Sequence, residues 1–569
     1  MRTPPDHPRI PFRTEVRRAR RIGRRLVALT LAAGSSLLLR AQSEIPDTAA
    51  LPAQPGETVL VERLAGIVFR ATPEAVVPDG VSYAGYDVST MPLLQGSGFA
   101  AVPEAFLGRP LSFESGHRIA LATRLYLQQL GYPFVAVFVP PQAIVGDTIQ
   151  IVVAPSRFDE LVRVEGARHF PEAHYRRALR QEPGRPLHVS TLAEDINWLN
   201  RHPYHRVAAV VEPGAEPGSS VLVLKVQESI PFRFSFGYDN TGTAVTDEDR
   251  LFAGVEWGNA FGRGDSLGYQ LRGDPALRRT ITHSANYATA LPWRHTLQWS
   301  GAWSHIESRL PAPFTQEGRS YQLGLRYDLN PRQLGGGWTG QWGFSADFKA
   351  TDNTLEFAAT PVTDNLTHVV QAGLRWTVSR RDARQNAQLT LALFGSPGGL
   401  TGRNDDAAFT GSRPGARASY LYGRLDGRYT RGLAGGFAWS LAASAQYAGR
   451  ELLGSEQLTG TGSSAVRGYR ESSAFGDDGA VVNAELHLPG FSPFKLNDLA
   501  DLFAFLDGAV LGTNGVGGDI TELASAGLGL NYQFGRHFSL RAAWGWTLKE
   551  MPSVATSSGR GHVSASVNW

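Results

Sequence analysis

The chain has 569 residues, of which 42% are hydrophobic and 19% are charged, with a formal net charge of +3 and no cysteine. Residues 1–41 hold ten Arg against one Asp and one Glu, so the rest of the chain carries a net charge of −5. This balance excludes the broad basic surface of a nucleic-acid-binding protein. The lack of cysteine excludes disulfides, thiolate metal sites and cysteine nucleophiles.

The first 41 residues have the pattern of a signal peptide. An Arg-rich run at 17–25 precedes an apolar stretch at 26–39. This stretch is shorter than the ~20 residues of a membrane-spanning helix but suits a signal-peptide core. We expect cleavage after Ala41, with a membrane anchor as the alternative. An exported chain without cysteine fits the bacterial envelope. Since no other segment is apolar enough for a spanning helix, a membrane-embedded form would have to be a closed β-barrel.

Residues 42–60 contain three Pro and are interpreted as a linker. Mixed α and β patterns follow. The segment 114–132 carries apolar residues on one helical face and is followed by two apolar strands. A β-α-α-β-β order is then predicted over 159–229, where two helices lie between a first strand and a final hairpin. We expect two α/β domains, 61–158 and 159–229, of which the first is a looser copy of the second.

From residue 230 to the end the pattern has a period of two. Each segment alternates apolar or aromatic residues with polar or small ones, as in the last, where Val563, Ala565 and Val567 share one face. About sixteen such segments are joined by alternately short and long connections, as in outer-membrane barrels. The long ones are expected at 352–367, 396–415 and 450–478. The pattern predicts a transmembrane β-barrel of about 16 antiparallel strands over 230–569, with soluble sandwiches or a propeller as the alternative.

No set of catalytic residues stands out in the sequence. There is no H-E-x-x-H and no Walker-type phosphate-binding motif, and the one G-x-S-x-G match, at 264–268, overlaps a short inter-strand turn. The "GRGDS" stretch is interpreted as a turn, and His202 and His205 as surface residues. Asp477 and Asp478 are adjacent on an extended chain, so their side chains point apart and are not a carboxylate pair. We therefore expect no enzyme activity, no cofactor and no metal site.

The insert at 450–478 places one arginine, Arg467, between Val466 and Gly468. A charge inside a barrel lumen needs a partner of opposite charge, because an unpaired buried charge is costly. Asp507, on the predicted strand 502–512, is a candidate partner. The spacing leaves open which face of that strand points inward, and the alternative is that both charges are solvated.

The run "GSSAVRGYRESSAFGDDGAVVNAEL" at 462–486 resembles the signature of the ShlB/FhaC/HecB transporters, the TpsB proteins of two-partner secretion. The V-R-G-Y tetrad is shared across the wider BamA/TpsB superfamily. The family's F-x-D-x-G motif is similar to Phe505–Ala509, where Ala replaces the last Gly. Segments 125–153 and 199–226 resemble its two POTRA domains, and the length before the barrel accommodates two of them.

The resemblance implies that the insert folds into the barrel, where Arg467 pairs with Asp507, Gly468 allows a tight backbone and Tyr469 packs beside it. The implied site has three parts. The transport or gating loop comprises Val466, Arg467, Gly468 and Tyr469. The barrel-wall partner motif comprises Phe505 and Asp507. The loop–strand junction comprises Gly476, Asp477 and Glu485.

The resemblance also implies an outer-membrane location with the POTRA domains in the periplasm. There the chain would capture an unfolded TpsA-type exoprotein, such as a haemolysin or adhesin, and secrete it through a lipid-embedded, monomeric barrel. Whether it also activates the exoprotein stays open. An outer-membrane protein assembly factor of the same superfamily is the nearest alternative. A passive porin or adhesin and an outer-membrane hydrolase are the others.

Overall fold

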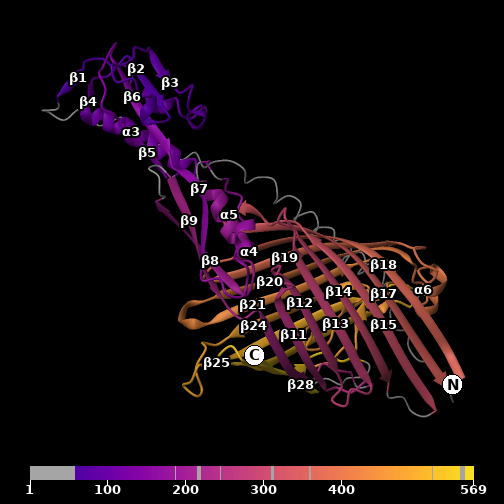
Figure 1. The fold of residues 1–569 in the computed structure, drawn as a ribbon. Helices are drawn as coiled ribbons and strands as arrows, with labels where there is room; N and C mark the ends of the chain where they lie inside the picture. Colours follow the sequence, from indigo (N-terminus) through magenta and orange to yellow (C-terminus); the bar gives the residue numbers. More distant parts are fainter. Residues whose placement is uncertain are drawn as a thin grey trace, which may run out of the picture. The chain divides into compact units, whose positions relative to one another are not determined.

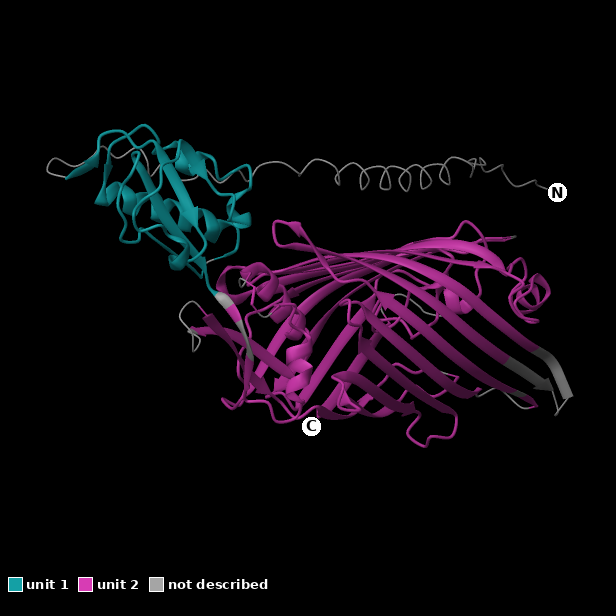
Figure 2. Ribbon diagram, turned by 45° about the horizontal axis from the view of Figure 1, so that its top comes forward, with its two compact units in different colours: residues 1–156 teal, residues 157–569 magenta. Residues whose placement is uncertain are grey.

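The computed structural model describes residues 58–132, 134–182, 184–185, 188–213, 219–243, 245–308, 313–357, 360–515, 517–551 and 558–569. The chain divides into two compact units, residues 1–156 and 157–569 (Figure 2). The predicted signal peptide and nearly all of the predicted linker lie outside the described residues. None of the helices in the described ranges is long and apolar enough to cross a membrane.

The first unit is an α/β module built on a four-stranded sheet. The strand order is β3 (Gly85–Asp87), β2 (Gly66–Arg70), β6 (Thr148–Pro155) and β5 (Val135–Phe138). Helix α3 (Phe113–Gln129) begins at a capping box between Ser112 and Ser115. Its buried face includes Ile119 and Leu127, which pack with the inner face of β2 and β6 in one apolar core. Smaller elements complete the module: β1 (Val59–Val61), β4 (Leu111–Ser112) and α2 (Ala101–Glu104).

A second α/β module begins the second unit. Its three-stranded sheet has the order β7 (Arg157–Glu165), β9 (Ser219–Glu228) and β8 (His205–Pro213). Helices α4 (Glu172–Arg177) and α5 (Val189–Leu199) lie between β7 and β8 in the chain. The predicted β-α-α-β-β order is therefore confirmed. Its core gathers Tyr175, Leu199 and Leu222 with neighbouring apolar side chains.

The rest of the second unit is a closed antiparallel barrel of sixteen long strands (Figure 1). These are β10 (Phe232–Asp239), β11 (Arg250–Ala260), β12 (Asp265–Gly273), β13 (Thr280–Ala290), β14 (Thr296–Ser308), β15 (Phe314–Asp328), β17 (Trp338–Phe357), β18 (Thr360–Arg381), β19 (Gln385–Pro397), β20 (Ser419–Gly432), β21 (Ala438–Tyr447), β24 (Asp478–His487), β25 (Asp498–Gly512), β26 (Ile520–Phe534), β27 (Phe538–Thr547) and β28 (Gly559–Asn568). A short strand, β16 (Arg332–Gly335), pairs only with β17. Pairing of β10 with β28 closes the ring.

The alternation of side chains separates the lumen from the outer wall. On β25 the residues Phe503, Phe505 and Asp507 are buried, whereas Leu502 and Leu506, at alternate positions, are exposed. The exposed leucines face outward, where a barrel meets lipid, and the alternate set faces the lumen. Because successive side chains of a strand point to opposite sides, Asp507 points into the lumen. The spacing alone does not decide which face of the strand points inward.

One predicted loop is wrong. Residues 352–357 and 360–367 are not a loop, because they continue β17 and β18, which reach 20 and 22 residues. A strand needs only about 9–11 residues to cross a bilayer. Beyond the lipid both faces of a hairpin are wet, so polar residues can continue a strand as long as the backbone ladder continues. The predicted loop at 396–415, by contrast, carries a short helix, α6 (Asp406–Ser412), capped by the Asp405 side chain.

Candidate functional site

The 450–478 insert folds back against the inner wall of the barrel. A small hairpin of β22 (Leu458–Thr459) and β23 (Phe475–Gly476) forms its base. Apolar residues of the insert form one buried cluster with side chains of the wall. Its members are Leu458, Ala465, Val466, Tyr469, Ala474, Val481, Ala509, Leu511, Leu523 and Met551. The insert therefore has a core in common with the barrel.

Arg467 and Asp507 form a bidentate ion pair. Arg467 Nε lies 2.7 Å from Asp507 Oδ2 and Arg467 Nη2 lies 2.8 Å from Oδ1. The backbone N–H of Arg467 also donates to Oδ2, at 3.1 Å. The two side chains are only 4% and 0% exposed. Two parallel bonds in a buried place give this pair both strength and a defined geometry.

The rest of the Arg467 environment comes from neighbouring strands. The Arg467 guanidinium lies 3.6 Å from the centre of the Phe505 ring, close enough for a cation–π interaction. Its Nη1 donates to Glu485 Oε1 at 2.5 Å. Glu485 was assigned to the loop–strand junction, and this assignment is wrong. It lies near the far end of β24 on the lumen face, because period two turns it toward the tip of the insert.

The residues around Arg467 fit a very close approach of the insert to the wall. Gly468 has a φ of +91°, and a Cβ there would lie 2.9 Å from the Gly545 carbonyl oxygen. Its N–H donates to His562 Nε2 at 3.1 Å. The Tyr469 ring is fully buried, and its hydroxyl donates to the Lys549 carbonyl at 2.6 Å. Val466 is likewise fully buried.

The sequence predicts Asp477 only as part of the junction between the insert and the next strand. The structure gives it a larger role. It is fully buried and accepts hydrogen bonds from four other residues, two of which lie elsewhere in the insert. The donors are Arg413 Nη1 and Nη2, Leu452 N, Gln457 Nε2 and Asn514 N. The adjacent Gly476 is also needed, since a Cβ there would lie 2.8 Å from the Asp478 carbonyl oxygen. The junction fastens the base of the insert at the end of the barrel opposite the β11–β12 and β13–β14 turns.

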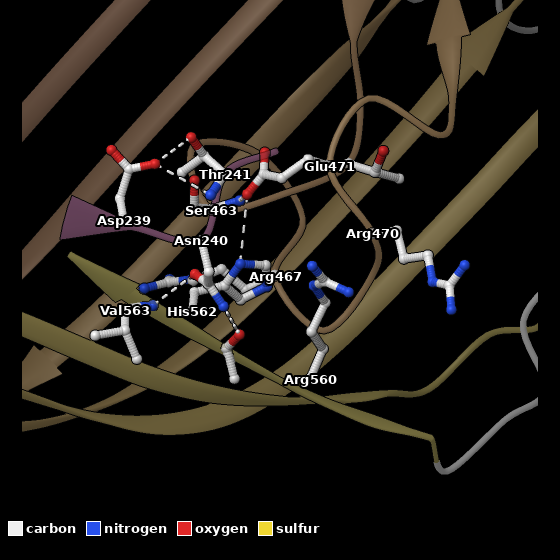
Figure 3. Close-up of polar contacts among 12 residues, drawn as sticks. Asp239, Asn240, Thr241, Ser463, Arg467, Arg470, Glu471, Arg560, His562 and Val563 are labelled. Carbon is white, nitrogen blue, oxygen red and sulfur yellow. Dashed lines mark hydrogen bonds and ion pairs between the residues drawn. The ribbon is translucent and has the colours of Figure 1, made fainter. Parts of the chain in front are cut away.

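His562 and Glu471 belong to the site but were missed in the sequence. His562 stands on β28, one of the two strands that close the barrel, and its side chain faces the insert (Figure 3). Its Nδ1 is 3.4 Å from Glu471 Oε1, and Glu471 also accepts from Ser463 N at 2.6 Å. One signal was available, because His562 has the same parity as the polar residues Ser564 and Ser566 of the last strand. Arg541 was missed as well, and its Nη2 donates to Glu485 Oε1 at 2.5 Å.

The interpretation of His202 and His205 as surface residues is wrong. Their rings stack with centres 4.7 Å apart, and His205 Nε2 is 3.3 Å from His174 Nε2. The three rings lie where the second module meets the β11–β12 turn, since a Cβ on Gly264 would lie 2.3 Å from the His174 ring. Burial lowers the pKa of His202 to about 4 and the pKa of His205 to about 3. The β11–β12 turn, about 60 residues further along the chain, covers them, and no local pattern could indicate this contact.

An ion pair joins the same module to another turn of the barrel. Asp195 of α5 is fully buried and accepts from Arg294, which lies in the β13–β14 turn. Arg294 also donates to the Ala178 carbonyl at 3.0 Å, and Arg180 Nε donates to Asp195 at 2.9 Å. The second module is therefore docked on the barrel turns by both the histidine stack and this buried carboxylate.

Comparisons with known proteins agree with this architecture. The family model described as haemolysin secretion/activation protein ShlB/FhaC/HecB matches residues 218–532. The chain is 23% identical over 406 residues to the outer membrane transporter CdiB of Dickeya dadantii, which covers 68% of each chain. It is 24% identical to CdiB of Escherichia coli O6:K15:H31 over 64% of this chain and 61% of that one.

Two solved structures share the fold. CdiB from Escherichia coli aligns with a TM-score of 0.70 at 17% identity, over 92% of this chain and 93% of that chain. CdiB from Acinetobacter baumannii aligns with a TM-score of 0.64 at 16% identity, over 98% of both chains. The resemblance to solved structures thus extends over both α/β modules and the barrel.

Proposed function

This chain belongs to the ShlB/FhaC/HecB family of haemolysin secretion/activation proteins, and on that premise we propose that it passes an unfolded exoprotein through its barrel when the 450–478 insert leaves the lumen. It is an outer-membrane transporter of the two-partner secretion type, with its POTRA domains in the periplasm. The family is one of transporters and not of enzymes, and it implies a TpsA-type exoprotein as the partner.

The observation that carries the proposal is the way in which the insert is held. Its tip is fastened by an ion pair and hydrogen bonds to Asp507, Glu485 and His562, all of which stand on wall strands. Charge-assisted bonds of this kind are specific in geometry, yet water or another polar group can replace them once the insert moves. Release of the insert would also separate the apolar core that it has in common with the wall, but it would leave the β21–β24 and β24–β25 ladders intact, so the barrel would stay folded.

Capture of the exoprotein is assigned to the two α/β modules. Each sheet has edge strands, β3 and β5 in the first module and β7 and β8 in the second. Edge strands bind an extended partner through backbone hydrogen bonds, which read little of its sequence and so suit an unfolded client. We assign the first POTRA domain to 61–156, the second to 157–229 and the barrel to 230–569, with the first boundary two residues earlier than predicted because Phe158 of β7 packs in the core of the second module. Ring closure within one chain supports a monomeric barrel in lipid.

The proposal is tested by deleting the gene for this chain in a strain that also encodes a large exoprotein with an N-terminal secretion domain. The exoprotein should then accumulate in the periplasm and disappear from the medium, while the amounts of other outer-membrane barrels stay unchanged. A general loss of outer-membrane barrels would contradict the proposal and favour the assembly factor. Complementation with the intact chain should restore the exoprotein to the medium.

A further inference from the structure

The side chain of Arg467 lies in a pocket of the wall that has the features of a guanidinium receptor. Asp507 meets it edge-on with two oxygens, at 2.7 and 2.8 Å, and Glu485 takes the remaining Nη1. The face of the Phe505 ring lies 3.6 Å from the guanidinium carbon. A planar cation with several N–H donors satisfies all three groups, whereas an ammonium offers neither the fork nor the flat face.

The pocket belongs to the wall and not to the insert. Glu485 stands opposite Phe505 in the β24–β25 ladder, and Asp507 is two residues further along β25. His487 Nε2 lies 3.2 Å from Glu485 Oε2 and helps to hold that carboxylate independently of Arg467. The backbone ladder of a closed barrel fixes these positions, so the pocket stays assembled when the insert leaves.

Withdrawal of Arg467 leaves a charge that needs a new partner. Within the described ranges, the hydrogen bonds to Asp507 all come from Arg467. Asp507 and Glu485 would then face the lumen as two carboxylates beside an aromatic ring. A buried carboxylate that loses its cation is strongly destabilised.

We propose that this pocket binds the guanidinium groups of arginine side chains in the polypeptide that occupies the open pore. The inference rests on the proposed function, because it needs the insert to withdraw and an unfolded chain to enter. Each arriving arginine takes the place that Arg467 holds in the closed state, so the wall exchanges one guanidinium for another. This exchange lowers the free energy of opening only when a client is present.

A second source of the same group lies within the chain. Arg541 on β27 already shares Glu485 Oε1 with Arg467, and its guanidinium lies 4.6 Å from the centre of the Phe503 ring. Its side chain is 46% exposed and also donates to Asn531 Oδ1 at 3.0 Å, and because exposed polar bonds contribute little it can shift along the wall. Arg541 can therefore move into the vacated pocket, and a test has to separate it from an arginine of the client.

The test measures how long short peptides stay in open channels of the purified full-length protein in planar bilayers. The probes are two unfolded glycine–serine peptides that differ only in carrying one Arg or one Lys. In Arg467→Ala channels we expect blockades by the Arg peptide to last about tenfold longer than those by the Lys peptide. Asp507→Asn in the same background should bring the two dwell times together. Arg467→Gln replaces Arg467→Ala if the latter does not assemble.

A further variant distinguishes the two sources. If blockades by the Arg peptide outlast those by the Lys peptide only in Arg467→Ala/Arg541→Gln channels, the pocket binds guanidinium groups and Arg541 occupies it after Arg467 has left. A preference already present in Arg467→Ala supports binding of the client side chain. Equal dwell times in both backgrounds, or a preference that survives Asp507→Asn, overturn the inference. Because no exoprotein is used, such a failure leaves the secretion assay of the proposed function intact.

Discussion

Arg413 donates to both oxygens of Asp477, with Nη1 at 2.5 Å from Oδ1 and Nη2 at 2.7 Å from Oδ2. Arg413 directly follows α6, in the connection between β19 and β20, and Asp477 directly precedes β24. The pair holds the base of the insert, whereas Arg467 and Asp507 hold its tip. Because the two ion pairs share no residue, substitutions at the base and at the tip should have different effects.

Replacement of Asp477 by Ala should loosen the base of the insert and lower the stability of the barrel. The change leaves Arg413 and two backbone N–H groups without their acceptor, and breaking a buried ion pair costs about 3–5 kcal/mol. Since Arg413 is partly exposed, the low end of this range is expected. The measurement is the temperature at which the folded barrel loses its fast migration in electrophoresis. Asp478→Ala, at the neighbouring and less buried carboxylate, is the control and should change this temperature less.

Replacement of Arg467 or Asp507 by Ala should each impair secretion while the barrel still assembles. Either change leaves one buried charge without its partner, which destabilises the closed position of the insert by about 3–5 kcal/mol. The channels should therefore open more often in bilayers, and Arg467→Lys should be intermediate because an ammonium cannot form the fork. Arg470→Ala is the matched control, since Arg470 lies three residues further along the insert and is exposed. Normal secretion by both single variants would contradict the assignment.

Replacement of Asp195 by Ala should detach the second module from the barrel turns. Arg294 and Arg180 would lose their common acceptor, and Arg294 is itself nearly buried. We expect amide hydrogen exchange of the full chain in detergent to become at least about tenfold faster in α5 and in the β13–β14 turn, which corresponds to about 1.4 kcal/mol. Glu194→Ala removes only an exposed partner of Arg180 and should leave exchange in that turn unchanged.

The second module should lose stability as the pH falls below about 6.5. Burial lowers the pKa of His174, and it lowers that of His202 to about 4 and that of His205 to about 3. In the folded module the rings of His202 and His205 therefore stay neutral between pH 6.5 and about 4, whereas in the unfolded chain they bind protons, so the loss of stability grows with acidity across this window. Glu228, Asp265 and Arg206 are the charged groups that act on these rings.

Hydrogen exchange in β8 (His205–Pro213) at pH values from 7.5 to 5 measures this effect, after correction for the intrinsic rate. His202→Phe keeps a flat ring but cannot titrate, so its loss of protection with acidity should be clearly smaller than that of the intact chain. An equal pH dependence in the two proteins would mean that the histidine stack does not set the acid sensitivity.

The barrel could be predicted from the sequence because lipid imposes one rule on every strand. Val563, Ala565 and Val567 alternate with serines for the same reason that Leu502 and Leu506 alternate with Phe503 and Phe505. That rule ends where the lipid ends, so the pattern predicts a loop at 352–367, where the β17–β18 hairpin continues beyond the lipid. The helices of the α/β modules were predictable from their own period, as α3 shows.

The site was predictable only in part, because its geometry depends on register. The resemblance pointed to Arg467 and Asp507, yet Glu485 reaches them only because β24 and β25 are paired as they are. Asp477 draws its donors from the insert and from the β19–β20 and β25–β26 connections, and the histidine stack needs a turn of the barrel to cover it. Such contacts join residues far apart in the chain, and neither spacing nor composition encodes them.

The most direct test of whether the insert withdraws is to tether it to the barrel wall with a disulfide that a reductant can open. Asn483 Nδ2 of β24 donates to the Ala465 carbonyl of the insert at 2.6 Å, so Ala465→Cys with Asn483→Cys puts one thiol on the insert and one on the wall at a point where the two segments touch. The chain has no other cysteine, so the disulfide between them is the only one that can form. With the disulfide closed, exoprotein secretion and channel opening should both stop, and a reductant should restore them. Full secretion through the oxidised, locked protein would contradict the account.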